Sequence, residues 1–231
     1  MSPTINRLFN LVEKVSSAFT AQRNIIVMCS GGVDSVAALH YFSKKNSSNY
    51  RVNGYHFNHK LRPQNDVMAA AVERLCTDLN IPLLLFSEAN KPLTTEAECR
   101  EARFDPLKSY KGSIIVTGHH LNDCVESYLM NCLRGHQGYM PIPFYTPIKN
   151  SKDTFISHPF LLTSKEKLKQ YCIKHNLMQY VVEDDTNTSI KGSRRNLLRN
   201  EIIPILDREH IGLEKIVKKI IEKRLLLECL K

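Results

Sequence analysis

The sequence predicts an α/β protein whose doubly wound, mainly parallel sheet is followed by a basic helical segment. Short aliphatic runs alternate with stretches in which apolar residues recur at helical spacing, and such alternation is typical of βαβ units. The aliphatic runs lie at 25–29, 52–57, 82–86 and 113–118. A chain of 231 residues is also long enough to bury one sizeable core.

The positive charge of the chain is concentrated near its C-terminal end. The net charge is +9, and residues 191–231 hold 11 Lys and Arg against 6 Asp and Glu. We therefore expect a main α/β domain over 1–190 and a basic helical segment over 191–231. A basic segment favours a polyanionic partner, above all nucleic acid. A solvated helix face is the alternative.

Cysteine usage and hydropathy bear on the compartment. The seven cysteines form no C-x-x-C pair, which argues against a zinc site or a redox motif and favours reduced thiols in the cytoplasm. No run of about 18 apolar residues is present, so we expect no membrane span. The sequence leaves the oligomeric state open, a homodimer included.

A first helix is predicted at the start of the chain. Ser2 and Pro3 form a helix-start signal, and apolar residues then recur at helical spacing rather than as the continuous core of a signal peptide. These apolar residues are Ile5, Leu8, Phe9 and Val12.

Two further helices are predicted from capping boxes. Thr95 with Glu98 precedes a helix over 96–110, and Thr163 with Glu166 precedes a helix over 165–176. Between them, residues 135–153 are rich in glycine, proline and aromatic residues, which indicates a loop or an irregular segment.

The last 40 residues divide into two predicted helices, over 194–206 and 213–230. In the second helix one apolar face should pack against the body, while lysines cluster on another face and should point outward. The apolar face comprises Leu213, Ile216, Val217, Ile220 and Ile221, and the lysines are Lys215, Lys218, Lys219 and Lys223.

Residues 30–35, Ser-Gly-Gly-Val-Asp-Ser, join the first predicted strand to a helix-like stretch. A strand that turns sharply into a helix exposes backbone N–H groups that bind anions. Gly31 and Gly32 would let the backbone approach a phosphate closely. The spacing and the lysine of a Walker loop are absent, as is a dinucleotide G-x-G-x-x-G. The stretch therefore predicts a pyrophosphate-binding turn.

Asp34 lies within this turn, where its carboxylate would repel a phosphate unless a metal ion lay between them. Asp34 therefore indicates a bound Mg²⁺. The alternative is a simple tight turn in which Asp34 favours the positive end of the following helix.

Two more segments follow strands at the same edge of the predicted sheet, residues 57–63 and 117–135. Ligands of such sheets bind beyond the carboxyl ends of the strands. On a helical wheel His119, Asp123 and Glu126 fall together and could hold a cation or an amine. An exposed polar face is the alternative. The opposite, buried stripe would comprise Leu121, Val125, Tyr128, Leu129 and Cys132.

The predicted helix at 96–104 carries Glu96, Arg100 and Arg103 at spacings of four and three. Glu96 and Arg100 could form a helical ion pair. If the start of the helix faces the cleft, the two arginines could instead clamp a phosphate. The sequence leaves both interpretations open.

The hexapeptide at 30–35 resembles the PP-loop of the N-type ATP pyrophosphatase superfamily, whose members cleave ATP between the α and β phosphates and adenylate a carbonyl or carboxyl oxygen. Together with the stretches at 58–63, 96–103, 117–135, 182–187 and 194–206, it makes the chain similar to the tRNA(Ile)-lysidine synthetase family over about residues 24–207.

The resemblance implies a Rossmann-like fold and the use of ATP and Mg²⁺. It implies that the C2 carbonyl oxygen of the wobble cytidine is adenylated in an isoleucine tRNA with a CAU anticodon. The amine of free L-lysine would then displace AMP to give lysidine.

The resemblance also implies roles for particular residues. ATP would contact Ser30, Gly31, Gly32, Val33, Asp34, Ser35, His59 and Arg103. Asp34, Asp123 and Glu126 are the candidate catalytic residues, and Asp123 and Glu126 would also bind lysine. Contacts to tRNA would come from Arg134, Arg195 and Arg199.

The sequence departs from the family pattern at a few places. Asn122 stands where the family often has a second Asp, His158 stands where Arg is usual, and the segment after Gly135 is atypical. Many family members carry C-terminal domains that grip the acceptor stem of tRNA. We expect a short form that lacks them.

Two alternatives differ from this reading. One is another PP-loop adenylating enzyme, such as a tRNA thiolase or an amide-forming ligase. Thiolases of this kind tend to need paired cysteines near the nucleotide, whereas Cys29, Cys124 and Cys132 are typical of small core residues. The other is a non-catalytic nucleotide- or RNA-binding relative, against which the retention of Asp34 argues.

Overall fold

The computed structural model describes residues 2–15, 22–87, 95–136, 140–149, 151, 153–182 and 194–230. Its centre is a six-stranded sheet in the order β3-β2-β1-β4-β6-β5. The strands are β1 (Arg23–Met28), β2 (Tyr50–Asn58), β3 (Leu83–Ser87), β4 (Ile114–Val116), β5 (Tyr145–Pro147) and β6 (Phe155–Ser157). The longer helices are α1 (Ser2–Val15), α2 (Val33–Ser43), α3 (Pro63–Asp78), α4 (Glu96–Phe104), α5 (Leu121–Leu133), α6 (Lys165–Lys174) and α9 (Leu213–Cys229).

The order of the strands creates a switch point beside β1. The chain moves outward from β1 to β2 and β3 and then returns to place β4 on the other side of β1. The pairs β1–β2, β1–β4, β2–β3 and β4–β6 are all parallel. The carboxyl ends of β1 and β4 therefore diverge into helices on either side of a crevice, which is where sheets of this kind bind ligands.

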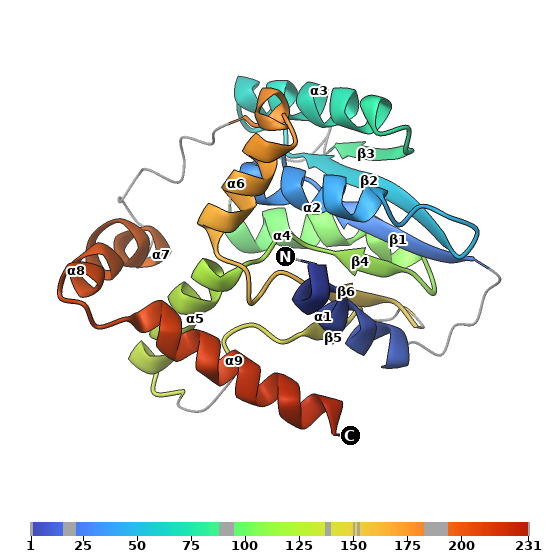
Figure 1. The fold of residues 1–231 in the computed structure, drawn as a ribbon. Helices are drawn as coiled ribbons and strands as arrows, with labels where there is room; N and C mark the ends of the chain where they lie inside the picture. The colour runs from blue at the N-terminus through green and yellow to red at the C-terminus, as the bar shows by residue number, and fades with distance from the viewer. Residues whose placement is uncertain are drawn as a thin grey trace.

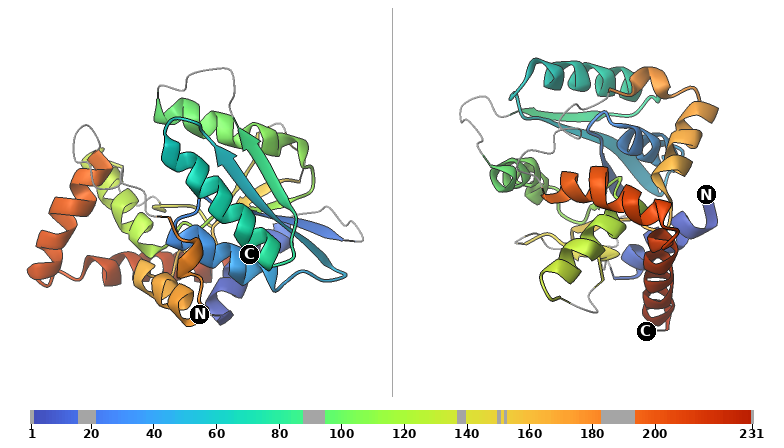
Figure 2. Two further views of the ribbon diagram at one scale, coloured as in Figure 1. Left: turned by 90° about the horizontal axis from the view of Figure 1, so that it is seen from above. Right: turned by 90° about the vertical axis from the view of Figure 1, so that its left-hand side faces the viewer.

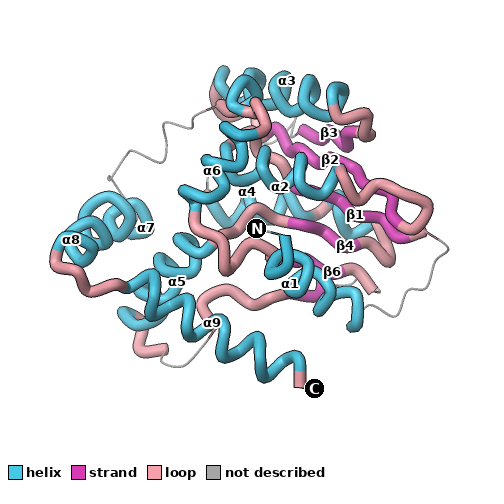
Figure 3. Tube along the Cα trace, in the orientation of Figure 1, coloured by secondary structure: helices cyan, strands magenta, loops and turns pink. Residues whose placement is uncertain are grey.

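Helices cover both faces of the sheet (Figure 1). In Figure 3 the strands lie side by side behind α1, α2 and α6. Buried side chains of α1, α2, α3 and α6 form the core on that face, including Phe9, Phe42 and Leu75. On the other face Ile26, Tyr55 and neighbouring residues pack against α4 and the segment after it. The predicted doubly wound α/β fold is confirmed.

The four predicted strands are present, but two further strands were not predicted. β5 lies inside the segment at 135–153 that the sequence predicts to be a loop, and β6 follows it. Each has only three residues, which is too short for an alternating pattern to show. β5 pairs antiparallel with β6 and forms an edge of the sheet.

The predicted helix starts are confirmed at two places and wrong at a third. α1 buries the predicted apolar residues Ile5, Leu8, Phe9 and Val12. Thr95 Oγ1 accepts from the Glu98 N–H at 3.1 Å, and the Thr95 N–H donates to Glu98 at 2.9 Å.

Thr163 does not cap α6, which begins after Ser164. Instead Thr163 is buried, and its carbonyl accepts from the Leu121 N–H at 2.9 Å. A second difference concerns α4, which ends at Phe104 and is followed by a 3₁₀ turn at Pro106–Ser109. Pro106 explains the break, because proline cannot continue an α-helical hydrogen-bond ladder.

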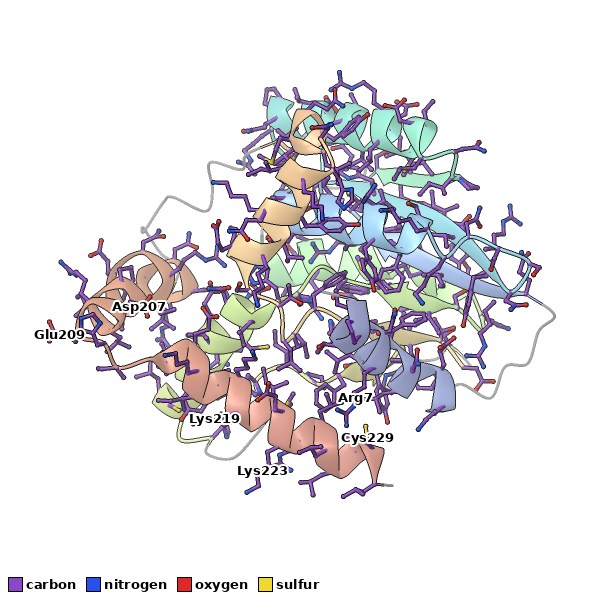
Figure 4. The ribbon with its side chains drawn as sticks, in the orientation of Figure 1. Arg7, Asp207, Glu209, Lys219, Lys223 and Cys229 are labelled. Carbon is purple, nitrogen blue, oxygen red and sulfur yellow. The ribbon has the colours of Figure 1, made fainter. Side chains whose placement is uncertain are left out.

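The last helix, α9, packs against α5 and α1. Its residues Leu213, Val217, Ile221 and Leu225 share a buried cluster with Leu8 of α1. Figure 2 shows that α1 and α9, which lie at opposite ends of the sequence, are close together in the fold. Ile216, predicted to be on the packed face, is 43% exposed. Of the four lysines predicted to point outward, Lys215, Lys219 and Lys223 are exposed, whereas Lys218 is half-buried. Figure 4 labels Lys219 and Lys223 along the helix.

No helix in the described part of the chain is both long and apolar enough to cross a membrane.

Candidate functional site

The turn between β1 and α2 forms the wall of a cavity at the switch point. Gly31 has a φ of +93°, and a Cβ on it would lie 3.4 Å from the Met68 side chain. Ser35 closes the turn, because its Oγ accepts from the Ser30 N–H at 3.1 Å and donates to the Gly32 carbonyl at 2.9 Å. The turn leads directly into the first residue of α2, so the unpaired N–H groups of the helix start face this edge of the sheet.

Gly118 brings the loop after β4 against this turn. A Cβ at Gly118 would lie 3.1 Å from the carbonyl carbon of Asp34 and 3.2 Å from the backbone nitrogen of Ser35. Cβ contacts this short are rare, so a glycine suits this close approach of the two backbones. Gly118 was not among the predicted site residues, although a glycine directly after a strand is a signal for such a contact.

The cavity has a volume of about 380 Å³. It is lined by many of the predicted site residues: Ser30, Gly32, Asp34, Ser35, His59, Arg103 and Asp123. Two members of the predicted turn lie outside the lining. Gly31 is buried, and the Val33 carbonyl accepts a hydrogen bond from the Cys172 thiol at 3.4 Å.

Asp34 and Asp123 meet at His120. Asp34 Oδ2 lies 3.3 Å from the ring nitrogen Nε2 of His120, and the backbone N–H of His120 donates to the Asp123 carboxylate at 2.9 Å. Burial alone would lower the pKa of His120, but the hydrogen bond that its ring donates to Asp34 and the charge of Asp123 raise this pKa above its ordinary value. Asp34 Oδ1 is buried and has no hydrogen-bond partner among the described residues. An oxygen of this kind fits a Mg²⁺ ion, which is commonly held by one or two carboxylates together with phosphates.

Glu126 does not line the cavity and is paired with arginines. Its side chain is 3% exposed and accepts two hydrogen bonds from Arg199, at 2.6 and 2.9 Å. Arg195 Nε lies 3.5 Å from the same carboxylate, and Arg199 lies 4.0 Å from Asp123. Arg199 belongs to a π-helical turn, Leu198–Ile202, a local irregularity that is frequent at functional sites. The chain thus brings both arginines to the first half of α5.

His119 precedes α5 instead of lying on its helical face. Its Nδ1 lies 2.8 Å from Thr117 Oγ1, which is also 2.6 Å from Nδ1 of His158. Burial lowers the pKa of His119, an effect that Asp123 opposes and Arg100 strengthens. Burial, with His119 and Arg100, lowers the pKa of His158 to about 3. Neither Thr117 nor His158 was predicted to take part in the site.

Arginines of α4 line the opposite wall of the cavity. Arg100 and Arg103 both contribute to the lining, and the Arg103 carbonyl accepts a hydrogen bond from the Tyr55 hydroxyl at 2.5 Å. The guanidinium of Arg100 lies over the Phe104 ring, 4.9 Å from its centroid. This placement favours the phosphate-clamp interpretation. The side chain of Glu96, the partner in the alternative, lies outside the described residues.

Some predicted residues lie elsewhere. Arg134 follows the last residue of α5, is exposed and does not line the cavity. Most of the stretch at 182–187 lies outside the described residues, but the Val182 N–H donates to the Gly31 carbonyl at 2.9 Å. Cys132, predicted to be buried on α5, is exposed, whereas Cys29 and Cys124 are buried.

The site combines a helix start, cationic side chains and carboxylates around one cavity. N–H groups and arginines can bind phosphates and stabilise charge that develops on them. The carboxylates can hold a metal ion or a cationic substrate. This arrangement suits an α/β protein that binds a nucleotide.

Comparison with known proteins places the chain in a family. A family model described as the PP-loop domain matches residues 2–206, and the chain therefore belongs to the PP-loop family. It is similar to tRNA(Ile)-lysidine synthase of Haemophilus ducreyi, with 30% identity over 197 residues. It is also similar to tRNA(Ile)-lysidine synthase of Prochlorococcus marinus, with 29% identity over 215 residues.

The matches cover most of this chain and only part of the relatives. They span 84% of the chain and 44% of the Haemophilus protein, and 87% of the chain and 62% of the Prochlorococcus protein. Among solved structures, the U34-tRNA thiolase NcsA from Methanococcus maripaludis superimposes with a TM-score of 0.66 at 14% identity, covering 96% of this chain and 78% of that one. At this identity the likeness supports the fold alone.

Proposed function

We propose that this protein ligates L-lysine to C2 of the wobble cytidine in an isoleucine tRNA with a CAU anticodon, at the expense of ATP. The C2 carbonyl oxygen attacks the α-phosphorus of ATP and pyrophosphate leaves. The amine of lysine then attacks C2, loses a proton and displaces AMP. The observation that carries the proposal is the Ser30–Ser35 turn and its cavity, in a chain that is similar to tRNA(Ile)-lysidine synthases over 84% of its length.

The residues around the cavity suit these two steps. The turn at 30–35 would bind the pyrophosphate that leaves, and Arg100 and Arg103 would orient the α-phosphate from the opposite wall. Asp34 would hold Mg²⁺, which offsets negative charge on the phosphates when it is bound. Asp123 is the second carboxylate that lines the cavity, and with Asp34 assigned to Mg²⁺ it is the group best placed to receive the ammonium of lysine.

Glu126 is less well placed than Asp123 to receive the ammonium of lysine directly. Its carboxylate is already satisfied by two hydrogen bonds from Arg199. Arg195 and Arg199 lie where the basic segment meets α5, and their positive charge would attract the phosphates of tRNA. Arg134 would contact the RNA farther out along α5.

The cysteines argue against sulfur transfer. Burial raises the pKa of the Cys29 thiol to about 11, so little thiolate forms at neutral pH. Within the described ranges, no group of three or more His, Cys, Asp and Glu side chains is placed to hold a metal ion or cluster.

The direct test supplies the protein with ATP, labelled lysine and an isoleucine tRNA bearing a CAU anticodon, followed by digestion to nucleosides. Labelled lysidine, with one AMP and one pyrophosphate formed per lysine, is the expected result. AMP release with no lysine on the RNA would point to another adenylating enzyme. No AMP with any acceptor would leave a binding protein.

Asp34→Ala tests the role of the carboxylate at the turn. We expect AMP release to fall by at least about a hundredfold, since removing one electrostatic contact to the reacting phosphates has effects of this size. The variant should still fold, although its unfolding midpoint should fall somewhat because the buried His120 loses its ion pair with Asp34. Retained AMP release in this variant would contradict the proposed phosphate site.

A further inference from the structure

His120 lies directly before α5 and against the turn at 30–35. Its ring nitrogen Nε2 is 3.3 Å from Asp34 Oδ2 and 3.6 Å from Asp123 Oδ2. The side chain of His120 is 6% exposed, and it does not line the cavity, whereas both carboxylates do. A ligand in the cavity therefore meets the two carboxylates and not the ring behind them. The steps proposed above make no use of this histidine.

The backbone fixes both sides of the contact between the ring and Asp34. His120 forms a β-bridge with Phe160, and its carbonyl accepts from the Cys124 N–H at 3.2 Å. On the other side, the backbone of Asp34 lies so close to Gly118 that a Cβ there would be 3.1 Å from the Asp34 carbonyl carbon. Neither the ring nor the carboxylate can move away without disturbing these backbone contacts.

The two carboxylates depend on the ring to different degrees. Asp123 Oδ2 also accepts from the backbone N–H of His120 at 2.9 Å, so its orientation is fixed without the ring. Among the described residues, the ring is the polar partner of Asp34 Oδ2, and Asp34 Oδ1 is buried without a hydrogen-bond partner. An ionised carboxylate only accepts, so His120 Nε2 carries the proton of this contact. The ring thus distinguishes two oxygens that are chemically equivalent.

We infer that His120 is a positioning residue for Asp34, which holds Oδ2 and thereby reserves Oδ1 for the metal ion that accompanies the nucleotide. Hydrogen bonds to a carboxylate fix its orientation toward a metal, and their loss typically weakens metal binding by about 10- to 100-fold. This role rests on the proposed function, which assigns Mg²⁺ to Asp34.

Three variants of His120 separate this role from a purely structural one. The side-chain nitrogen of glutamine is separated from Cα by as many bonds as histidine Nε2, and that of asparagine by one fewer. His120→Gln therefore keeps a donor within reach of Asp34. His120→Asn withdraws the donor and His120→Met removes it.

The measurement is the affinity of the full chain for α,β-methylene ATP, which cannot be cleaved between the α and β phosphates, with Mn²⁺ and with EDTA. Mn²⁺ prefers the same oxygen ligands as Mg²⁺. For the wild type we expect tighter binding with Mn²⁺ than with EDTA. The ratio of the two affinities should fall by about 10- to 100-fold in His120→Met and His120→Asn and stay close to the wild-type ratio in His120→Gln. The affinity in EDTA should change little, because the backbone N–H groups and arginines still bind the phosphates.

An equal loss of affinity with Mn²⁺ and with EDTA would show that His120 only supports the fold of the site, and would overturn the inference. A wild-type protein that binds no more tightly with Mn²⁺ would overturn it as well, as would His120→Gln and His120→Asn with the same ratio. If His120→Met does not fold, His120→Asn decides. The measurement uses neither lysine nor tRNA, so a failure of lysine ligation alone would count against the proposed function and leave this role standing.

Discussion

Gly118 is the residue through which the two loops of the site touch. Its missing side chain lets the backbone after β4 rest on the backbone of Asp34 and Ser35. The start of α2 and the start of α5 are thereby held at a fixed separation. The shape of the cavity between these two helix starts therefore depends on the absence of a Cβ at Gly118.

We expect Gly118→Ala to destabilise the protein by about 1–3 kcal/mol, because the new methyl group would press on backbone atoms that cannot move aside alone. The affinity for ATP should fall as well, since the turn at 30–35 would shift. Urea unfolding and ATP titration measure the two effects.

Gly32→Ala is the matched control for stability. Its φ is −77°, and the nearest atom to a new Cβ is Ser30 Oγ at 3.7 Å. Its unfolding free energy should therefore stay within about 0.5 kcal/mol of the wild type. Equal stability of the two variants would argue against the close approach at Gly118.

His158 should make stability depend on pH. Its pKa is about 3 in the folded protein, compared with 6.5 for an ordinary histidine. Between these values the unfolded chain binds a proton that the folded chain does not, so stability falls as the pH is lowered through this window. The slope from this group has an upper limit of about 1.4 kcal/mol per pH unit.

His158→Phe should remove that part of the slope. At pH 7.5 the unfolding free energies of the wild type and the variant would differ by the packing cost of the substitution. This difference in unfolding free energy should narrow steadily toward pH 4. Parallel curves for the two proteins would show that His158 is not held neutral by burial.

At the scale of elements, the Arg199–Glu126 pair fastens the basic segment to α5. The π-helical turn at Leu198–Ile202 sets the arginine opposite a carboxylate that is 3% exposed. Breaking a buried pair from one side leaves an uncompensated charge, which is far more costly than losing a surface ion pair.

Arg199→Ala should therefore cost about 3 kcal/mol, near the lower end for buried pairs because this arginine is 30% exposed. Arg195→Ala removes the same charge from the same carboxylate at 3.5 Å and 49% exposure, and should cost less than about 1 kcal/mol. Urea unfolding compares the two variants. Similar destabilisation in both would mean that the bidentate pair adds no special stability.

The sequence predicted the long elements and the phosphate-binding turn because their signals are local. Aliphatic runs, capping boxes and the hexapeptide each lie within a few adjacent residues. The features that the sequence did not predict depend on residues far apart in the chain. Thr117 meets His158 only because β4 pairs with β6, Glu126 meets Arg199 across 73 positions, and β5 is a strand because β6 lies beside it. Helical periodicity placed Glu126 on a polar face but could not show that an arginine would bury it.

At the scale of the whole molecule, the exposed lysines of α9 extend the positive surface beyond the cavity. Lys215, Lys219 and Lys223 follow one another at intervals of four residues and are exposed, and Figure 4 shows Lys223 pointing away from the body. A row of this kind suits the phosphates of an RNA backbone.

Replacing these three lysines with alanine should weaken tRNA binding and lower the slope of log K against log salt by about 0.7–0.9 for each phosphate that the lysines no longer neutralise. Filter binding or fluorescence titration at several salt concentrations measures the slope. The control replaces Lys44, which follows α2, together with Lys108 and Lys111, which lie in and just after the 3₁₀ turn at Pro106–Ser109. An equal decrease of the slope in the control would mean that net charge alone attracts the RNA.

The strand β5 has a consequence for how molecules of this protein meet one another. The Phe144 carbonyl accepts a hydrogen bond from the His158 N–H, and the Ile148 N–H donates to the Thr154 carbonyl. Because backbone groups alternate in direction along a strand, those of Tyr145 and Pro147 point away from β6. Proline has no N–H to offer, and within the strand the outer row of donors is reduced to Tyr145. This edge of the sheet is therefore a poor site for pairing with a strand of another molecule. High protein concentration should not cause fibrous aggregation through β5.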